Sequence, residues 1–208
     1  MIYKNVSSWI DMNEVHVICM KVTSRQTYKV IRAILKLKKF TQYEVSKKEK
    51  VTFSLVNRVV NWLVSRGYVA KRTGHYELVA PAAIFSLFPV YRKMKPYVTF
   101  DVNISAEDAL KMMKDKGKLC LTTALSYHDD YYRDPVVHAY LEDKKTIDSL
   151  KNLPKGYTHI ELYHEDLNKD DFEKARGQWI TNKARTVMDL FCSNKAYAAE
   201  RLIKKEWS

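Results

Sequence analysis

Residues 24–79 carry three helix-start signals in close succession, and this order is the feature that most constrains the fold. Ser24 precedes a segment whose apolar residues recur at helical spacing, and Thr41 has capping-box spacing with Glu44. Thr52 precedes a third apolar-periodic segment after a short turn. The spacing therefore predicts three helices joined by short turns.

The third segment predicts a helix with one apolar and one polar face. The predicted apolar face consists of Phe53, Val56, Val59, Val60 and Leu63. The polar stripe consists of Ser54, Asn57, Arg58, Asn61 and Ser65. Gly67 supplies a left-handed helix stop, and residues 68–70 and 76–79 read as strands on either side of a turn. The whole order predicts a winged helix-turn-helix domain over residues 23–80.

Charge is distributed unevenly along the chain. The first 100 residues hold 18 Lys and Arg against 5 Asp and Glu, a formal charge of +13, whereas the rest of the chain carries −1. A polar helix face or a Lys-rich turn alone is usually just solvated surface. Combined in this order within a strongly basic segment, they favour binding to the phosphates of double-stranded DNA.

Three groups of residues are predicted to contact DNA. The polar stripe is expected to face the major groove through Ser54, Asn57, Arg58 and Asn61. The second helix and its turn are expected to contact phosphate through Gln42, Tyr43, Lys47, Lys48 and Lys50, and Thr52 belongs to the same DNA-binding set. The turn of the hairpin contributes Lys71, Arg72 and His75.

The remaining chain alternates helix and strand signals. An apolar stretch predicts a connecting helix over residues 81–96, packed against both halves. Residues 97–208 predict an α/β domain on a small mixed sheet. Its expected strands are 97–102, 136–141 and 158–163. Its expected helical segments are 105–117, 119–127 and 146–150. A last helical region is expected to begin after a Thr181 cap, to break near Ser193-Asn194 and to end at Trp207. The chain is thus predicted to be a two-domain α+β or α/β protein.

Three segments of the second half resemble a known family. Residues 119–128, Leu-Cys-Leu-Thr-Thr-Ala-Leu-Ser-Tyr-His, and the strand at 136–141 are similar to a helix and strand of the AbiEi-type antitoxins. Residues 181–190 are similar to a later helix of that family, without the usual Pro. The resemblance implies a winged helix-turn-helix followed by a domain of nucleotidyltransferase-like fold. It also implies repression of an operon that encodes a nucleotidyltransferase-type toxin as partner.

An enzyme is the alternative from a different functional class. A metal-dependent hydrolase or nuclease could use His128, Asp129, Asp130, Asp134 and His138, with further ligands from His159, His164, Glu165 and Asp166. Structural or surface roles for these residues are the stronger interpretation, because residues 129–135 resemble an exposed turn. An active nucleotidyltransferase needs a Gly-Ser turn, and the chain has no such dipeptide. We therefore expect an inactive domain, no enzyme activity and no cofactor.

Other expectations concern environment and partners. Cys19, Cys120 and Cys192 are odd in number and widely spaced, which predicts reduced and mostly buried thiols. No signal peptide or membrane span is expected, so we predict a cytoplasmic protein. Residues 1–22 are an extension read as a strand or a partner-contacting arm. A homodimer is compatible with the sequence, and a repressor that senses a small ligand remains an alternative. Arg185 and Asp189 are predicted to form a surface or half-buried ion pair.

Overall fold

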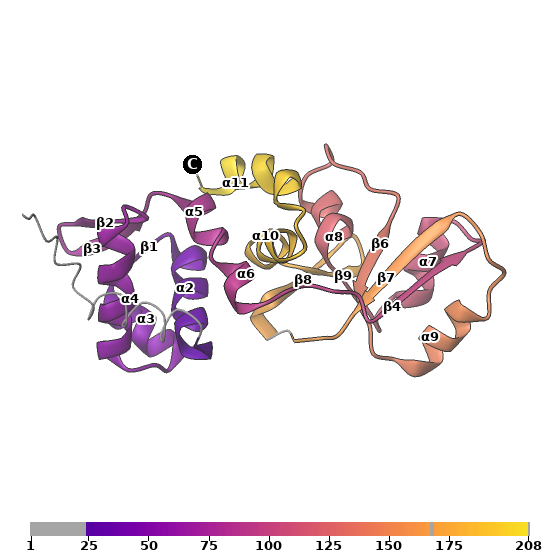
Figure 1. The fold of residues 1–208 in the computed structure, drawn as a ribbon, viewed down its shortest axis with the longest axis horizontal. Helices are drawn as coiled ribbons and strands as arrows, with labels where there is room; N and C mark the ends of the chain where they lie inside the picture. Colours follow the sequence, from indigo (N-terminus) through magenta and orange to yellow (C-terminus); the bar gives the residue numbers. More distant parts are fainter. Residues whose placement is uncertain (1–23, 167–168, 208) are drawn as a thin grey trace, which may run out of the picture.

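The computed structural model describes residues 24–166 and 169–207, so the predictions for residues 1–22 and Cys19 lie outside the described part. The described residues form a mixed α/β structure with two sheets (Figure 1). One sheet has three strands and belongs to the N-terminal unit, which we define as residues 24–80. The other has six strands and belongs to the C-terminal part, residues 97–207.

The three predicted helices of the N-terminal unit are confirmed. They are α2 (Arg25–Leu37), α3 (Gln42–Glu49) and α4 (Phe53–Ser65). Each begins at its predicted cap: Ser24, Thr41 and Thr52 accept hydrogen bonds from backbone N–H groups in the following turn, and Glu44 completes the capping box.

The predicted hairpin is also present, and it has a third strand that the sequence did not predict. The hairpin consists of β2 (Val69–Arg72) and β3 (His75–Leu78), and Gly67 has the expected positive φ of 71°. The short strand β1 (Lys39–Phe40) pairs antiparallel with β3 and gives the order β1-β3-β2. Its two residues are too few for any sequence periodicity to reveal.

The predicted single connecting helix is wrong. Two short helices, α5 (Pro81–Phe85) and α6 (Phe88–Tyr91), stand in its place, and the chain then extends toward the next strand. Each of these helices has a proline in its first turn. Pro89 suits the first turn of α6, because backbone N–H groups there have no partner within the helix. It has no N–H to donate to the last turn of α5, so the two helices cannot form one continuous helix.

The six strands of the larger sheet are ordered β4-β7-β6-β5-β9-β8, with both parallel and antiparallel pairs. The predicted strands are confirmed as β4 (Val98–Val102), β6 (Val137–Tyr140) and β7 (Thr158–Tyr163). The helices of this part are α7 (Ala106–Met113), α8 (Leu121–His128), α9 (Lys144–Lys151), α10 (Lys183–Cys192) and α11 (Glu200–Trp207), with short 3-10 turns η1 (Lys169–Asp171) and η2 (Ala196–Ala199). The break near Ser193-Asn194 lies between α10 and η2, as predicted.

Several predicted boundaries in this part are corrected. Residues 118–119 form β5 (Lys118–Leu119), so the expected helix over 119–127 begins later, and α7 ends before Gly117. The hairpin of β8 (Phe172–Ala175) and β9 (Gln178–Thr181) was not predicted. Its turn places Arg176 and Gly177 at φ of 47° and 77°, the left-handed pair that a two-residue hairpin requires. Thr181 ends β9, and Asn182 is the cap of α10.

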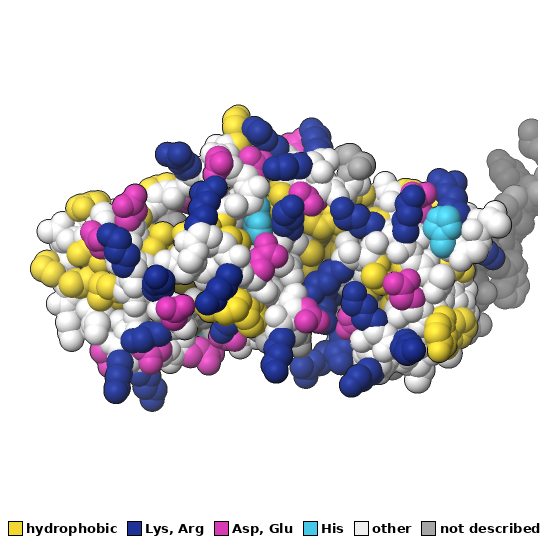
Figure 2. Space-filling model, turned by 180° about the vertical axis from the view of Figure 1, so that it is seen from behind, with side chains coloured by type: hydrophobic (Ala, Val, Ile, Leu, Met, Phe, Trp, Pro, Cys, Tyr) yellow, Lys and Arg dark blue, Asp and Glu magenta, His cyan; other side chains and the backbone are white. Residues whose placement is uncertain are grey.

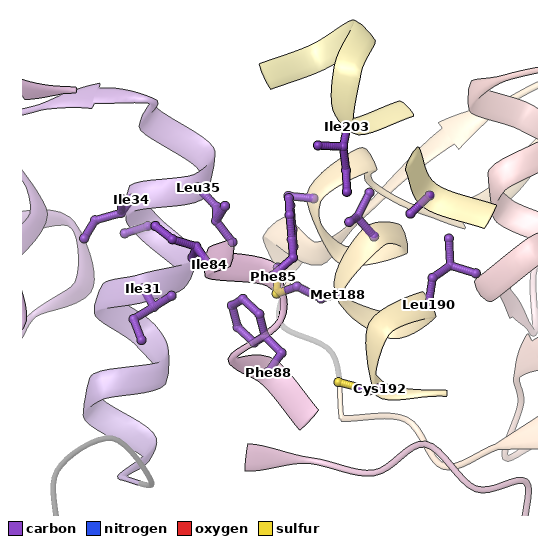
Figure 3. Close-up of a cluster of buried hydrophobic side chains, with 14 of the residues drawn as sticks. Ile31, Ile34, Leu35, Ile84, Phe85, Phe88, Met188, Leu190, Cys192 and Ile203 are labelled. Carbon is purple, nitrogen blue, oxygen red and sulfur yellow. The ribbon is translucent and has the colours of Figure 1, made fainter. Parts of the chain in front are cut away.

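The hydrophobic core runs without interruption from the N-terminal unit into the C-terminal part. Ile31 and Leu35 of α2 belong to the same buried cluster as Ile84 and Phe85 of α5, and this cluster continues to Met188 of α10 and Ile203 of α11 (Figure 3). A second cluster fills the opposite face of the larger sheet beneath α7 and α9. The N-terminal unit and the C-terminal part therefore share a core at their junction, and the linking segment packs against both halves as expected.

Candidate nucleic-acid interface

The outer face of α4 presents a row of polar side chains near its N-terminal end. Ser54, Arg58 and Asn61 are exposed, and Asn57 is half-buried. The Nδ2 group of Asn61 donates to Oδ1 of Asn57 over 3.2 Å, so the two amides form one hydrogen-bonding surface. Arg58 has no ion-pair partner among the described residues, and its guanidinium is therefore free to bind another acceptor.

The opposite face of α4 fixes the helix in the N-terminal unit. Val56, Val60 and Leu63 have no exposed surface and pack into the core beside α2 and α3. Burying each of these side chains stabilises the fold by about 1.5–3 kcal/mol. The direction of the polar stripe is thus determined by the apolar stripe, and it points away from the protein.

Two predictions for this unit need correction. Phe53 was assigned to the buried face, but 52% of its surface is exposed, because it is the first residue of α4 and lies beyond the end of the core. Gln42 was expected to contact phosphate, but it is buried and its Nε2 donates to the Tyr76 hydroxyl over 3.0 Å. Tyr43, the next residue, is 68% exposed, so its side chain is accessible for the predicted contact with phosphate.

Exposed lysines flank α4 on α3 and on the turn that follows. Lys47, Lys48 and Lys50 are exposed and have no ion-pair partner within the described ranges. Lys50 adopts a left-handed φ of 52° as it ends α3, and this allows the chain to turn sharply into the Thr52 cap. The Thr52 hydroxyl accepts from the Leu55 N–H as the cap of α4, and this bond leaves its own O–H able to donate.

The hairpin adds a second basic element. Lys71 and Arg72 are exposed, and the Nδ1 atom of His75 lies 3.1 Å from the Thr73 carbonyl oxygen. Arg72 also contacts the carboxylate of Glu77 at 3.3 Å. The hydrogen bond from Arg72, together with Lys39, lowers the pKa of Glu77, so this acid stays charged and partly neutralises the hairpin. Lys71 is therefore the stronger candidate for binding an anion.

A buried polar network joins the N-terminal unit to the C-terminal part. Asp189 accepts hydrogen bonds of 2.8 Å from Arg185, Arg92 and the Tyr140 hydroxyl. Arg185 also contacts Asp171, which in turn pairs with Arg32 and Lys36 of α2. The i, i+4 pairing of Arg185 with Asp189 is confirmed, but its predicted surface position is wrong: the two residues are 1% and 0% exposed.

The Asp189 carboxylate keeps the two buried guanidinium groups beside it charged. Burial by itself lowers the pKa of Arg185, but the neighbouring Asp189 carboxylate raises it well above its usual value. Arg92 behaves in the same way, again because of Asp189. Burial raises the pKa of Tyr140, which keeps its hydroxyl protonated and able to donate. The network is therefore a structural connection between the two parts of the chain.

The candidate metal ligands are dispersed among different partners. The Nε2 atom of His128 lies 2.8 Å from the Thr181 carbonyl oxygen, Asp129 pairs with Arg201, and Asp130 pairs with Arg176. Asp134 contacts Lys195, as does His138. Further along the chain, His159 pairs with Asp101, His164 with Glu142, Glu165 with Lys118 and Asp166 with Arg185. No group of three or more His, Cys, Asp or Glu side chains suited to a metal ion occurs in residues 24–166 and 169–207.

His138 instead belongs to a buried polar cluster. Its Nδ1 atom lies 3.0 Å from the Thr122 hydroxyl, and its Nε2 atom lies between Lys195 at 3.0 Å and Glu161 at 3.3 Å. The contact with His138 is the main reason that the pKa of Glu161 falls to about 2. Sequence reasoning missed this cluster because Lys195 is 57 residues away from His138.

Two further observations bear on the general predictions. Cys120 and Cys192 are buried free thiols, as predicted. Within residues 24–166 and 169–207, no helix combines the length and apolar character needed to cross a membrane.

In comparisons with known proteins, no family model, curated protein or solved structure matches this chain.

Proposed function

We propose that residues 24–80 form a winged helix-turn-helix domain that binds double-stranded DNA. The proposal rests on the outer face of α4. Its polar stripe consists of Ser54, Asn57, Arg58 and Asn61, and the opposite face of the helix is buried in the core. Asn side chains can contact adenine and Arg can contact guanine through two hydrogen bonds each. In helix-turn-helix proteins, the N-terminal residues of the second helix of the motif make such contacts.

The surrounding basic side chains are proposed to position this helix on the duplex. Lys47, Lys48 and Lys50 would bind phosphates on one side of the groove, and Lys71 would bind the neighbouring backbone. Arg72, His75, Tyr43 and Thr52 complete the proposed interface. Gln42 is removed from it because its amide is buried against Tyr76.

A salt titration tests the interface. Fluorescence anisotropy would measure the affinity of the full chain for a labelled duplex between about 50 and 200 mM salt. Because each neutralised phosphate contributes about 0.9 to the slope of log K against log salt, several contacts would reduce affinity by orders of magnitude over that range. Replacing both Lys47 and Lys48 by Ala should lower the slope by about 2. Lys151→Ala, at an exposed position of α9, is the matched control and should leave the slope unchanged. Tight binding that ignores salt would contradict the proposal.

The proposed biological role is repression of transcription, as the antitoxin of a toxin-antitoxin operon. The support comes from the three segments that resemble the AbiEi-type antitoxins. They lie on the β5–α8 segment, on β6 and on α10. Helix α8 packs against both β6 and α10, so the similar residues form one unit. The proposed partner is a nucleotidyltransferase-type toxin, and the proposed fold of residues 97–208 is that of an inactive nucleotidyltransferase.

A reporter assay and a binding assay test this role separately. The chain should repress a reporter placed under the promoter upstream of its own coding sequence, and Arg58→Ala should relieve that repression. An adjacent reading frame should encode a nucleotidyltransferase whose product co-purifies with the chain and whose toxicity the chain suppresses. Repression without such a neighbour would favour a repressor that responds to a ligand.

A further inference from the structure

A cleft of about 310 Å³ lies where the N-terminal unit meets the C-terminal part. Its walls include Arg25, Lys29 and Arg32 of α2, Tyr91 and Arg92 at the end of α6, and Asp166 beyond β7. In Figure 2, seen from behind, Lys and Arg side chains gather along the junction of the two parts. This volume is at the lower end of the range for small-molecule sites.

The basic residues of α2 share one helix face. Arg25, Lys29 and Arg32 are spaced at i, i+4 and i+7, so their side chains lie in a row along the cleft. The other side of α2 packs against α3 and α4, and α2 also contacts α6 and α10 (Figure 1). The cleft is therefore separated by α2 from the polar face of α4, and DNA seated on that face would not enter it.

Positive charge at the cleft exceeds negative charge. Arg92 is balanced by Asp189 and Asp166, and the other cations of the buried network have acidic partners of their own. Arg32, for example, pairs with Asp171 and Glu49. Arg25 and Lys29 have no acidic partner in the described portions of the chain, although Lys29 is half-buried. Two positive charges remain uncompensated beside the cleft.

Two of the residues that line the cleft also hold a buried hydrogen-bonding group without a partner among the described residues. One is the Nε–H of Arg32, a residue that is only 6% exposed and whose other guanidinium nitrogens are occupied. The other is the buried hydroxyl of Tyr91. Burial raises the pKa of Tyr91, so this hydroxyl stays protonated and can donate. A buried donor without a hydrogen-bond partner destabilises the free protein, and a ligand that accepts from the donor would remove that cost.

We propose that this cleft binds a small phosphate ester. A phosphate group carries a charge of about −1.5 to −2 at pH 7 and three strong acceptor oxygens, which match the two unpaired cations and the two unpaired donors. The cleft is larger than a phosphate group, so it has room for a small organic portion beside the Tyr28 ring, which also lines it. The site does not depend on the proposed DNA interface, and its test uses no DNA.

Isothermal titration calorimetry of the full chain with inorganic pyrophosphate, at fixed ionic strength, tests the proposal. Wild-type protein should bind one equivalent in a saturable manner. Lys29→Gln should weaken binding at least tenfold, and Arg25→Gln several-fold. Lys151→Gln removes an equally positive but exposed lysine from α9 and should leave the affinity unchanged. No saturable binding up to about 10 mM pyrophosphate, or equal losses in Lys29→Gln and Lys151→Gln, would overturn the assignment.

Two further variants separate ligand binding from folding. Tyr91→Phe removes an unpaired buried hydroxyl, so it should raise the melting temperature of the free protein while weakening pyrophosphate binding. Asp166→Asn removes the one carboxylate that lines the cleft and releases donors of Arg92 and Arg185, so it should tighten binding. A lower melting temperature in Tyr91→Phe, or weaker binding in Asp166→Asn, would contradict the proposed site.

Discussion

Removal of the Asp189 carboxylate is predicted to destabilise the protein more than any change to a surface charge. Asp189 has no exposed surface and accepts three hydrogen bonds, two of them from the guanidinium groups of Arg92 and Arg185. Each bond to a charged group contributes about 1.5–3 kcal/mol. Arg92 and Arg185 keep contacts with Asp166, so they do not lose every partner. We expect Asp189→Ala to lower the free energy of unfolding by about 3–5 kcal/mol, the usual cost of breaking a buried ion pair.

Urea denaturation followed by circular dichroism measures this loss. With a slope of about 1–3 kcal/mol per molar urea, the midpoint should fall by about 1 M or more. Arg185→Met should cost less, because Asp189 then keeps Arg92 and Tyr140 as partners. Glu200→Ala removes one member of an exposed i, i+4 pair with Lys204 and should change the midpoint little. If Asp189→Ala and Glu200→Ala shifted the midpoint equally, the buried network would not connect the two parts as described.

Three other substitutions test the core, a close backbone contact and a charged cluster. Phe85→Ala should lower the unfolding free energy by about 3–5 kcal/mol, since Phe85 is fully buried and its ring contacts Phe191 of α10 and Trp207 of α11. A loss below about 1 kcal/mol would argue against the shared core. Gly156→Ala places a Cβ atom 2.3 Å from the Asn103 Cα atom and should cost about 1–3 kcal/mol, whereas an unchanged melting temperature would show that the two loops do not touch. The pKa of Glu161 is about 2 in the folded chain and 4.5 ordinarily, so its contribution to stability is complete above pH 4.5 and is lost as the pH falls toward 2. Glu161→Gln should flatten the loss of stability across that window in acid titrations, and an unaltered pH profile would contradict the assigned contact with His138.

Local sequence signals predicted the N-terminal unit well. Ser24, Thr41 and Thr52 each cap a helix as expected, because a hydroxyl bond to the next turn depends only on neighbouring residues. The sequence also predicted the polar stripe of α4, because residues spaced three and four apart lie on the same face of a helix. The sequence predicted a buried Phe53 and a Gln42 that contacts phosphate, whereas Phe53 is exposed and Gln42 is buried. The extent of the core and the position of the Tyr76 hydroxyl decide both outcomes, and they depend on tertiary contacts.

The sites at the junction could not be predicted in the same way. Arg32 meets Asp171 across 139 residues, and Arg92 meets Asp189 across 97. A helical period relates residues three or four apart, so it found the pairing of Arg185 with Asp189 but not the burial that makes this pair important. The basic row on α2 was visible only as scattered lysines and arginines. Its significance depends on Tyr91 and Asp166, which the fold brings to the same cleft.

Selection of duplexes from a randomised DNA pool by the full chain tests the central claim most directly. If α4 reads base edges, wild-type protein should enrich a defined sequence, and Arg58→Ala and Asn57→Ala should each cost about 1–3 kcal/mol on that sequence and relax the base preference. Lys71→Ala should instead weaken binding to all sequences alike and lower the salt dependence. Lys47→Ala is a fourth variant, at a predicted phosphate contact. The assignment of α4 to the major groove would be contradicted if wild-type protein enriched no sequence, or if all four variants lost the same affinity.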